Sequence, residues 1–269
     1  MGRLKDKAAI VLGAAGRDNM GQHTARRLRQ EGADVTVAGR HPEELERFAT
    51  EIEAHWAVCD ITRQSDVVAL AAFAKGRMGN LDIGVNATGW GYLSPFLESS
   101  EADIDKIMDL QFKGPIFFFQ ALIEAMEHGG SIIQISSATA TIMLNNHAAY
   151  MGTKAGIDHV VRCVAHEFGD RGIRANSISP GLTESPMTGG DLKAIPGLLE
   201  AFEPCYPLGR IGTSDDIAAA VVWLASDECF MTGQNLQVNG GLTLRRNPTG
   251  QEIQASMQSA REKVSAGAS

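Results

Sequence analysis

Short apolar runs alternate with amphipathic segments of helix length from the start of the chain to about residue 240. The runs with the length of buried strands are Ala8–Leu12, Val35–Ala38, Trp56–Val58, Leu81–Val85 and Ser131–Ile135, with two more near 173–178 and 235–238. The helical segments lie near 20–31, 42–53, 64–78, 101–128, 148–169 and 214–226. Such alternation predicts an α/β fold, in which one doubly wound parallel sheet has helices on both faces.

Two segments interrupt this alternation. Residues 182–212 contain four prolines and several glycines, which is typical of a long substrate-binding loop inserted in a compact domain. Residues 243–269 form a polar tail with two interpretations, a disordered terminus or an arm that packs on a neighbouring subunit. With no repeat and no second domain visible, we expect residues 1–242 to form one domain.

Charge and composition exclude several classes of protein. The net charge of −8, with no cluster of Lys and Arg, argues against a nucleic-acid-binding surface. No apolar run is long enough for a membrane span, and the apolar stretch at Ala8–Leu12 is too short for a signal peptide. The four scattered cysteines form no Cys-x-x-Cys pair, which favours reduced thiols in a cytoplasmic protein.

The first predicted strand runs directly into a glycine-rich turn that precedes a helix. Glycines at such a turn let the backbone approach a pyrophosphate, and the helix N-terminus favours negative charge. The turn therefore predicts a dinucleotide site, although its spacing is not G-x-G-x-x-G. The candidate contacts in it are Gly13, Arg17, Asn19, Met20 and Gly21.

The end of the second predicted strand indicates which dinucleotide binds. An NAD site normally has an Asp or Glu there, which accepts hydrogen bonds from the adenosine ribose. This strand ends in Gly39-Arg40, and its one acid, Asp34, stands at the beginning. A guanidinium group pairs well with a 2′-phosphate, and Arg17 can add a second positive charge. We therefore expect NADP(H) rather than NAD(H).

A possible acid–base group follows the fifth predicted strand. Tyr150 and Lys154 are four residues apart, so they share one face of a predicted helix. An ammonium group near a phenol favours the phenolate and makes the tyrosine a usable general acid near neutral pH. Ser137, at the end of the preceding strand, can hold a carbonyl oxygen against this tyrosine.

Together these motifs resemble the short-chain dehydrogenase/reductase family over about residues 4–243. The segments similar to the family's motifs are Asp60-Ile61, Asn86-Ala87-Thr88-Gly89, Ser136-Ser137, Tyr150 with Lys154, and Pro180-Gly181-Leu182-Thr183-Glu184-Ser185. The resemblance implies a Rossmann-like fold, with Ser137, Tyr150 and Lys154 as the catalytic residues. It also implies that Lys154 holds the nicotinamide ribose, and that Asn86 steadies the central strand. The cofactor contacts that it adds are Asp60, Ile61, Asn86, Tyr150, Lys154, Pro180, Gly181, Thr183 and Ser185.

Two positions depart from the family pattern. The glycine turn is two residues longer than the usual Gly-x-x-x-Gly-x-Gly, which leaves the contacts from Arg17 to Met20 provisional. Gln111 stands where the family usually has an Asn that takes part in proton relay to the lysine. Glutamine keeps the amide but adds a methylene, so we expect Gln111 to serve the relay through a shifted water molecule.

The predicted substrate pocket is mostly apolar and aromatic. Its candidate residues are Trp90, Tyr92, Met143, Leu144, Met187 and Tyr206. Such walls suit a bulky hydrophobic ketone or a cyclic alcohol. In the alternative interpretation, several of these side chains only pack the loop against the domain.

Three functions remain open at this point. The leading one is an NADP-dependent oxidoreductase that interconverts a hydrophobic ketone and a secondary alcohol by hydride transfer. The others are a 3-oxoacyl thioester reductase and a non-catalytic NADP-binding sensor with the same fold. His147, His159 and His166, near the predicted catalytic helix, share neither metal-ligand spacing nor carboxylate partners. They are interpreted as ordinary surface or core histidines, and no metal is expected. The resemblance implies a homodimer or a homotetramer that acts on a small molecule.

Overall fold

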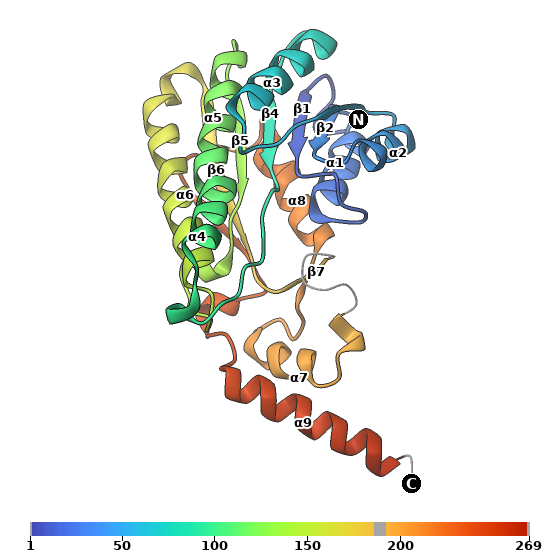
Figure 1. Ribbon diagram of the computed structural model, residues 1–269. Helices are drawn as coiled ribbons and strands as arrows, with labels where there is room; N and C mark the ends of the chain where they lie inside the picture. The colour runs from blue at the N-terminus through green and yellow to red at the C-terminus, as the bar shows by residue number, and fades with distance from the viewer. Residues whose placement is uncertain (1, 186–191, 268–269) are drawn as a thin grey trace.

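The computed structural model describes residues 2–185 and 192–267, and a parallel sheet of seven strands forms its centre (Figure 1). These strands are β1 (Ala8–Leu12), β2 (Asp34–Gly39), β3 (His55–Val58), β4 (Ile83–Asn86), β5 (Gly130–Ile135), β6 (Ile173–Pro180) and β9 (Asn235–Val238). Their order is β3-β2-β1-β4-β5-β6-β9. The doubly wound parallel sheet expected from the sequence is confirmed.

The strand register brings the predicted motifs to one edge of the sheet. Leu12 at the end of β1 is opposite Ala38 on one side and Asn86 on the other. Asn86 is in turn opposite Gln134, near the end of β5. The strand order reverses between β1 and β4, and ligands of such sheets bind beyond the carboxyl ends of the strands at this switch point.

Helices cover both faces because alternate residues of each buried strand point to opposite sides. In β1, Ala9 and Val11 belong to one core cluster, while Ile10 and Leu12 belong to the other. The helices on the first side are α1 (Met20–Gln30), α2 (Pro42–Ile52) and α8 (Ser214–Ala225). Those on the second side are α3 (Gln64–Met78), α5 (Gly114–Ala125) and α6 (Ala148–Glu167).

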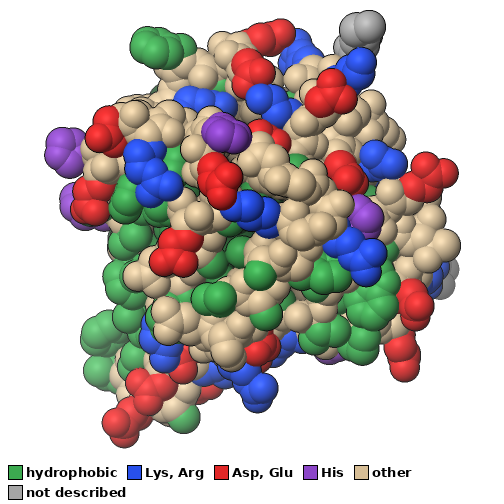
Figure 2. Space-filling view, turned by 90° about the horizontal axis from the view of Figure 1, so that it is seen from above, with side chains coloured by type: hydrophobic (Ala, Val, Ile, Leu, Met, Phe, Trp, Pro, Cys, Tyr) green, Lys and Arg blue, Asp and Glu red, His purple; other side chains and the backbone are tan. Residues whose placement is uncertain are grey.

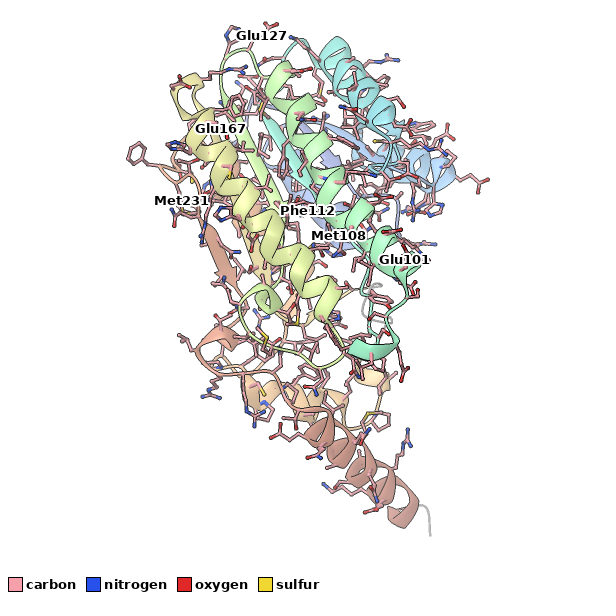
Figure 3. All side chains as sticks on the ribbon, turned by 60° about the vertical axis from the view of Figure 1, so that its left-hand side comes forward. Glu101, Met108, Phe112, Glu127, Glu167 and Met231 are labelled. Carbon is pink, nitrogen blue, oxygen red and sulfur yellow. The ribbon has the colours of Figure 1, made fainter. Side chains whose placement is uncertain are left out.

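The helix expected over residues 101–128 is interrupted. α4 (Glu101–Met108) leads into a π-helical turn at Asp109–Lys113, and α5 follows. The amide of Gly114 donates to the carbonyl of Asp109, and Pro115 has no amide hydrogen for the normal bond to residue 111. Phe112 of this turn packs over Gly156 of α6, and Figure 3 shows the two helical runs side by side.

The segment after β6 returns to the domain through a second, two-stranded sheet. β7 (Thr183–Glu184) pairs with β8 (Gly212–Thr213), so the two ends of the predicted substrate loop lie together. Between the described residues of these strands lie a 3₁₀ turn at Leu192–Ala194, α7 (Leu198–Phe202) and a second 3₁₀ turn at Glu203–Cys205. Other 3₁₀ turns are Phe96–Glu98, Ala138–Ala140, Gly169–Arg171 and Leu242–Leu244.

The polar tail contains one long helix, α9 (Gly250–Gly267), which lies against α7 of the same chain (Figure 1). Ile253 packs on the small core cluster of the loop, and Met257 lies against Gly197. Contact of this tail with a neighbouring subunit stays a prediction.

The surface carries intermixed charges. On the face seen in Figure 2, Lys and Arg side chains are interspersed with Asp and Glu. None of the helices in the described ranges is long and apolar enough to cross a membrane.

Candidate active site

Ser137 and Tyr150 come together from two different elements. Ser137 directly follows the end of β5, and Tyr150 lies in the first turn of α6. The Ser137 hydroxyl lies beside the Tyr150 phenol, where it acts to lower the pKa of that phenol. Ser137 Oγ also lies 2.8 Å from Thr139 Oγ1, in the 3₁₀ turn between these elements. This turn therefore holds the serine hydroxyl on the side where Tyr150 lies.

Lys154 lies one helical turn after Tyr150 and is buried. Its Nζ donates a hydrogen bond of 2.9 Å to the carbonyl oxygen of Ile135 and lies 5.6 Å from the centre of the Tyr150 ring. Burial lowers the pKa of Lys154 to about 8, against an opposing effect of the Asp158 charge. The lysine is therefore held in place by the last residue of β5.

The Tyr150 pKa differs from the sequence expectation. Burial of the hydroxyl raises its pKa, and the hydrogen bond with Ser137 opposes this shift. We expected Lys154 to lower the pKa of Tyr150, but in the protein alone burial dominates and the net shift of the pKa is upward. The physical reason is that the ammonium group is turned toward the Ile135 carbonyl while the phenol is desolvated.

His147 is a neighbour of Tyr150 that sequence reasoning treated as an ordinary surface or core histidine. Its ring stacks on the Tyr150 ring, with centroids 4.2 Å apart and planes 25° apart. Burial lowers the pKa of His147, which favours the neutral imidazole. Its position three residues before Tyr150, at the N-cap of α6, is the signal that could have indicated this contact.

Gln111 bridges two walls of the site from the π-helical turn. Its Oε1 accepts the backbone N–H of Trp90 at 2.8 Å, and its Nε2 donates to Thr153 Oγ1 at 3.0 Å. Thr153 directly precedes Lys154, and its hydroxyl donates to the carbonyl of Tyr150. Both ends of the Gln111 amide thus have protein partners, and the proton relay expected through Gln111 stays a prediction.

The glycine turn after β1 is closely packed against the rest of the sheet edge. Gly13 has a φ of +107°, and a Cβ there would lie 2.6 Å from the backbone of Ala87. A Cβ on Gly21 would lie 2.5 Å from the Gly13 carbonyl oxygen. Asn19 caps α1 by accepting the amide of Gln22, and its Nδ2 donates to Gly13. The predicted contacts Gly13, Asn19, Met20 and Gly21 therefore lie around the N-terminus of α1, a position that favours anions, and their contact with a pyrophosphate stays a prediction.

The two predicted phosphate-binding arginines lie at this same edge. Arg17 is in the glycine turn, and Arg40 directly follows β2. Both side chains are exposed, and neither has a hydrogen bond or ion pair with another residue in the described parts of the chain. Two exposed guanidinium groups at this edge have the chemistry to bind a phosphate group.

The remaining predicted cofactor contacts also follow strand ends. Asp60 accepts hydrogen bonds from the amide and hydroxyl of Thr62, and Ile61 is buried beside α5. Asn86 donates to Gln134 and accepts from Thr88, so its side chain joins β4 to β5. Pro180, Gly181, Thr183 and Ser185 lie along the segment from the end of β6 to β7 and just beyond.

The predicted substrate residues fall into separate groups. Trp90 and Tyr92 pack together, with ring centroids 4.8 Å apart, beside the Gln111 bridge. Met143 is 68% exposed, and Leu144 is half-buried. Tyr206 is buried, and its hydroxyl accepts the amide of Leu182 at 2.7 Å, so it holds the loop against the domain. Met187 lies outside the described residues.

Comparison with known proteins places this site in a family. A family model described as enoyl-(acyl carrier protein) reductase matches residues 13–243. D-threitol dehydrogenase of Mycolicibacterium smegmatis is 34% identical over 252 residues, which cover 90% of this chain and 95% of that protein. The chain belongs to the short-chain dehydrogenase/reductase family. As a member, it is an oxidoreductase of CH–OH and C=O groups that uses a nicotinamide cofactor.

Other members share most of their length with this one. Trans-4-hydroxycyclohexanecarboxylate dehydrogenase of Sinomonas cyclohexanicum is 33% identical over 263 residues, covering 91% of this chain and 96% of its own. A short-chain dehydrogenase/reductase structure from Mycobacterium ulcerans superposes with a TM-score of 0.87 at 27% identity, covering 95% and 98% of the two chains. The family fold therefore extends over nearly the whole chain.

Proposed function

We propose that this oxidoreductase uses NADP(H) to interconvert a hydrophobic, for example cyclic, ketone and the corresponding secondary alcohol. The observation that carries the proposal is the grouping of Ser137 beside Tyr150, with the buried Lys154 one helical turn away. This group lies at the same sheet edge as the glycine turn.

The protein's part in reduction is to place the carbonyl group and to supply a proton. When bound, NADPH would supply a hydride, which carries both electrons to the carbonyl carbon. Ser137 Oγ donates a hydrogen bond to the carbonyl oxygen and stabilises the negative charge that develops there. Tyr150 gives its proton to that oxygen, so the product is the alcohol. A protonated Lys154 favours the tyrosinate that remains.

Preference for NADP(H) over NAD(H) is supported by the end of β2. Arg40 stands there without an acidic neighbour on the strand end, and Arg17 supplies a second cation from the glycine turn. A 2′-phosphate adds charge-assisted hydrogen bonds with such guanidinium groups, whereas the 2′-hydroxyl of NAD has no carboxylate to bind.

A hydrophobic cyclic substrate is supported by the side chains beyond β4 and β5. Trp90 and Tyr92 form one aromatic wall, and Met143 and Leu144 extend it after the catalytic strand. Two relatives are named for ring substrates, the S. cyclohexanicum enzyme and a 3β-hydroxysteroid dehydrogenase of Eggerthella lenta, which is 34% identical over 254 residues.

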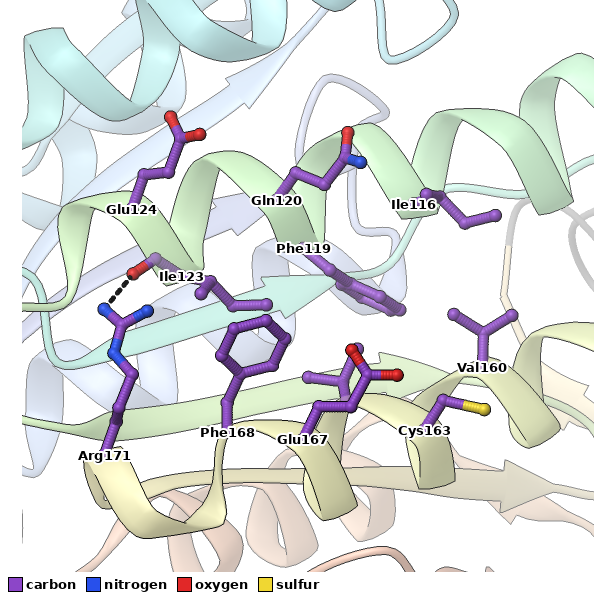
Figure 4. Close-up of a pocket in the computed structure, with 11 residues that line it drawn as sticks. Ile116, Phe119, Gln120, Ile123, Glu124, Val160, Cys163, Glu167, Phe168 and Arg171 are labelled. Carbon is purple, nitrogen blue, oxygen red and sulfur yellow. Dashed lines mark hydrogen bonds between the residues drawn. The ribbon is translucent and has the colours of Figure 1, made fainter.

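We also propose a homodimer or homotetramer that forms through α5 and α6. A groove of about 400 Å³ lies between these helices. Figure 4 shows residues that line it, among them Ile116, Phe119, Val160, Cys163 and Phe168. A second copy of the chain would remove this apolar surface from water.

We propose a cytoplasmic location as well. The support is that the cysteines are all free thiols, as expected in a reducing environment: Cys59, Cys163, Cys205 and Cys229.

The test is NADPH oxidation, followed by the absorbance of the reduced nicotinamide, against hydrophobic ketones, cyclic ketones and 3-oxoacyl thioesters. NADH and the Tyr150→Phe variant are run in parallel. Turnover of ketones that requires Tyr150 and prefers NADPH supports the proposal. Turnover of thioesters alone would favour the acyl thioester reductase. NADPH binding without turnover across the panel would favour the sensor.

A further inference from the structure

Asp158 lies on α6 four residues after Lys154, and its carboxylate joins three elements. Asp158 Oδ2 accepts a hydrogen bond of 2.9 Å from Ser136 Oγ, just beyond the end of β5. The same oxygen accepts a hydrogen bond of 2.6 Å from Asn235 Nδ2, at the start of β9. One oxygen atom therefore connects the catalytic helix with two strands of the sheet.

These bonds complete a regular set of contacts between α6 and the end of β5. Tyr150 lies beside the Ser137 hydroxyl, Lys154 donates to the Ile135 carbonyl and Asp158 accepts from the Ser136 hydroxyl. The three helical residues are spaced by four and lie on one face of α6. Each of the three consecutive residues 135–137 therefore has one of these side chains against it.

Lys154 is the one charged group that faces the carboxylate in the described parts of the chain. The groups that reach Asp158 from other elements are neutral: Ser136 after β5, Ser177 on β6 and Asn235 on β9. Asp158 Oδ1 and Ser177 Oγ are buried, and neither has a hydrogen bond of good geometry within the described residues. Burial above all raises the pKa of Asp158, and the Lys154 charge is among the effects that oppose this.

We propose that Asp158 is a positioning residue of the active site. It fixes the helix that carries Tyr150 and Lys154 on the strand end that carries Ser137, and its negative charge keeps the buried Lys154 an ammonium ion. The inference rests on the proposed function only in giving Lys154 a role in catalysis. The contacts and the charge themselves are independent of the cofactor and the substrate.

An amide can replace the hydrogen bonds of this carboxylate but not its charge. Asparagine has the same shape, and its amide oxygen can still accept from Ser136 or from Asn235. Asp158→Asn therefore tests the charge while it disturbs the packing little. The matched control is Asp170→Asn, which removes one negative charge from an exposed residue in the turn after α6.

The first experiment titrates Lys154 by NMR in protein labelled with ¹³C-lysine, without cofactor or substrate. The Lys154 signal is assigned by its loss in Lys154→Met. We expect the Lys154 midpoint to fall by about one pH unit in Asp158→Asn, because a nearby opposite charge favours the charged form. Asp170→Asn should titrate like the wild type. Equal midpoints in Asp158→Asn and the wild type would overturn the proposal.

A reciprocal measurement keeps the proposal testable if Asp158→Asn does not fold. Loss of the cation in Lys154→Met should raise the midpoint of the Asp158 carboxyl, observed in ¹³C-aspartate-labelled protein. An unchanged carboxyl midpoint would contradict the coupling.

The second readout is the affinity for NADPH, measured as a function of pH. The loss of affinity at alkaline pH should begin about one pH unit lower in Asp158→Asn than in the wild type. If the wild type binds neither NADPH nor NADH, the proposed function fails, while the two titrations still decide the role of Asp158.

Discussion

The two halves of the sheet edge are built in different ways. Around the ends of β4 and β5, the polar groups of the predicted catalytic residues are bound by the protein: Ser137 by Thr139, Lys154 by Ile135 and Gln111 by Thr153. Beyond β1 and β2, Arg17 and Arg40 are exposed and make no hydrogen bond or ion pair with the described residues. The catalytic half is thus pre-organised by the fold, whereas the arginines remain available to a ligand.

This contrast has an energetic consequence. Removing a buried group of the catalytic half leaves its partners without hydrogen bonds, so stability and turnover should both change. Removing an exposed arginine should change the free energy of unfolding little, because its charge is already solvated. Substitutions in the arginine half should therefore change the affinity for a phosphate-bearing ligand and little else.

The largest effect is expected from Tyr150→Phe. Without the phenolic proton, the carbonyl oxygen has no general acid, and we expect kcat to fall by about a thousandfold. The affinity for NADPH should change little, because the arginine half is untouched. Steady-state kinetics on the substrate found in the panel, with NADPH binding followed by fluorescence, checks both expectations.

His147→Phe is the matched control for the ring packing at this position. It keeps an aromatic ring against Tyr150 and leaves the tyrosine proton in place, so it should retain far more activity than Tyr150→Phe. If Tyr150→Phe kept most of its turnover, the assignment of Tyr150 as the acid would be wrong.

Gln111→Ala should produce the next largest effect, this time on stability. The substitution leaves the Trp90 amide and the Thr153 hydroxyl without their buried partner and opens a cavity at the π-helical turn. We expect a loss of about 3 kcal/mol in the free energy of unfolding, measured in urea.

Gln111→Glu tests the two halves of this bridge separately. A carboxylate can still accept from Trp90 but cannot donate to Thr153, which must then turn its own hydroxyl toward it. We expect the free energy of unfolding of Gln111→Glu to lie between that of the wild type and that of Gln111→Ala. Equal stability of all three proteins would show that the bridge does not hold the two walls together.

Arg40→Ala should affect only the ligand. Loss of one charge-assisted pair with the 2′-phosphate corresponds to about 2 kcal/mol, which weakens NADPH binding roughly thirtyfold. NADH binding and the urea midpoint should remain as in the wild type. Equal weakening of both cofactors would indicate that Arg40 serves the fold or the adenine rather than the phosphate.

The sequence predicted the buried framework better than the side-chain partners. The strands and Ser137, Tyr150 and Lys154 could be placed because apolar periodicity and residue spacing are local signals. The π-helical turn could not, since it depends on Pro115 in the first turn of α5 and on the packing of Phe112 against Gly156 of α6. The contact of Asp158 with Ser136 and Asn235 joins residues 22 and 77 positions apart, and no local pattern indicates it.

The smallest predicted effect comes from Glu44, on a helix next to the arginine half of the sheet edge. Glu44 on α2 accepts hydrogen bonds from Arg47 and from Gln22 of α1, and these bonds lower its pKa to about 2. Because the folded-state pKa lies below the unfolded value, the carboxylate stabilises the fold above about pH 4.5. This contribution is lost as the pH falls from there toward 2.

Solvent screening reduces the contribution of this partly exposed group to about 1 kcal/mol. Glu44→Gln should therefore lower the urea midpoint slightly at neutral pH and have a much smaller effect near pH 2, where about half of the wild-type carboxyl is also protonated. Arg17 is among the charges that lower the Glu44 pKa, so the substitution also removes a nearby negative charge that a phosphate would meet at Arg17. NADPH should then bind slightly more tightly to Glu44→Gln while NADH does not, and equal effects on the two cofactors would place Arg17 outside the phosphate site.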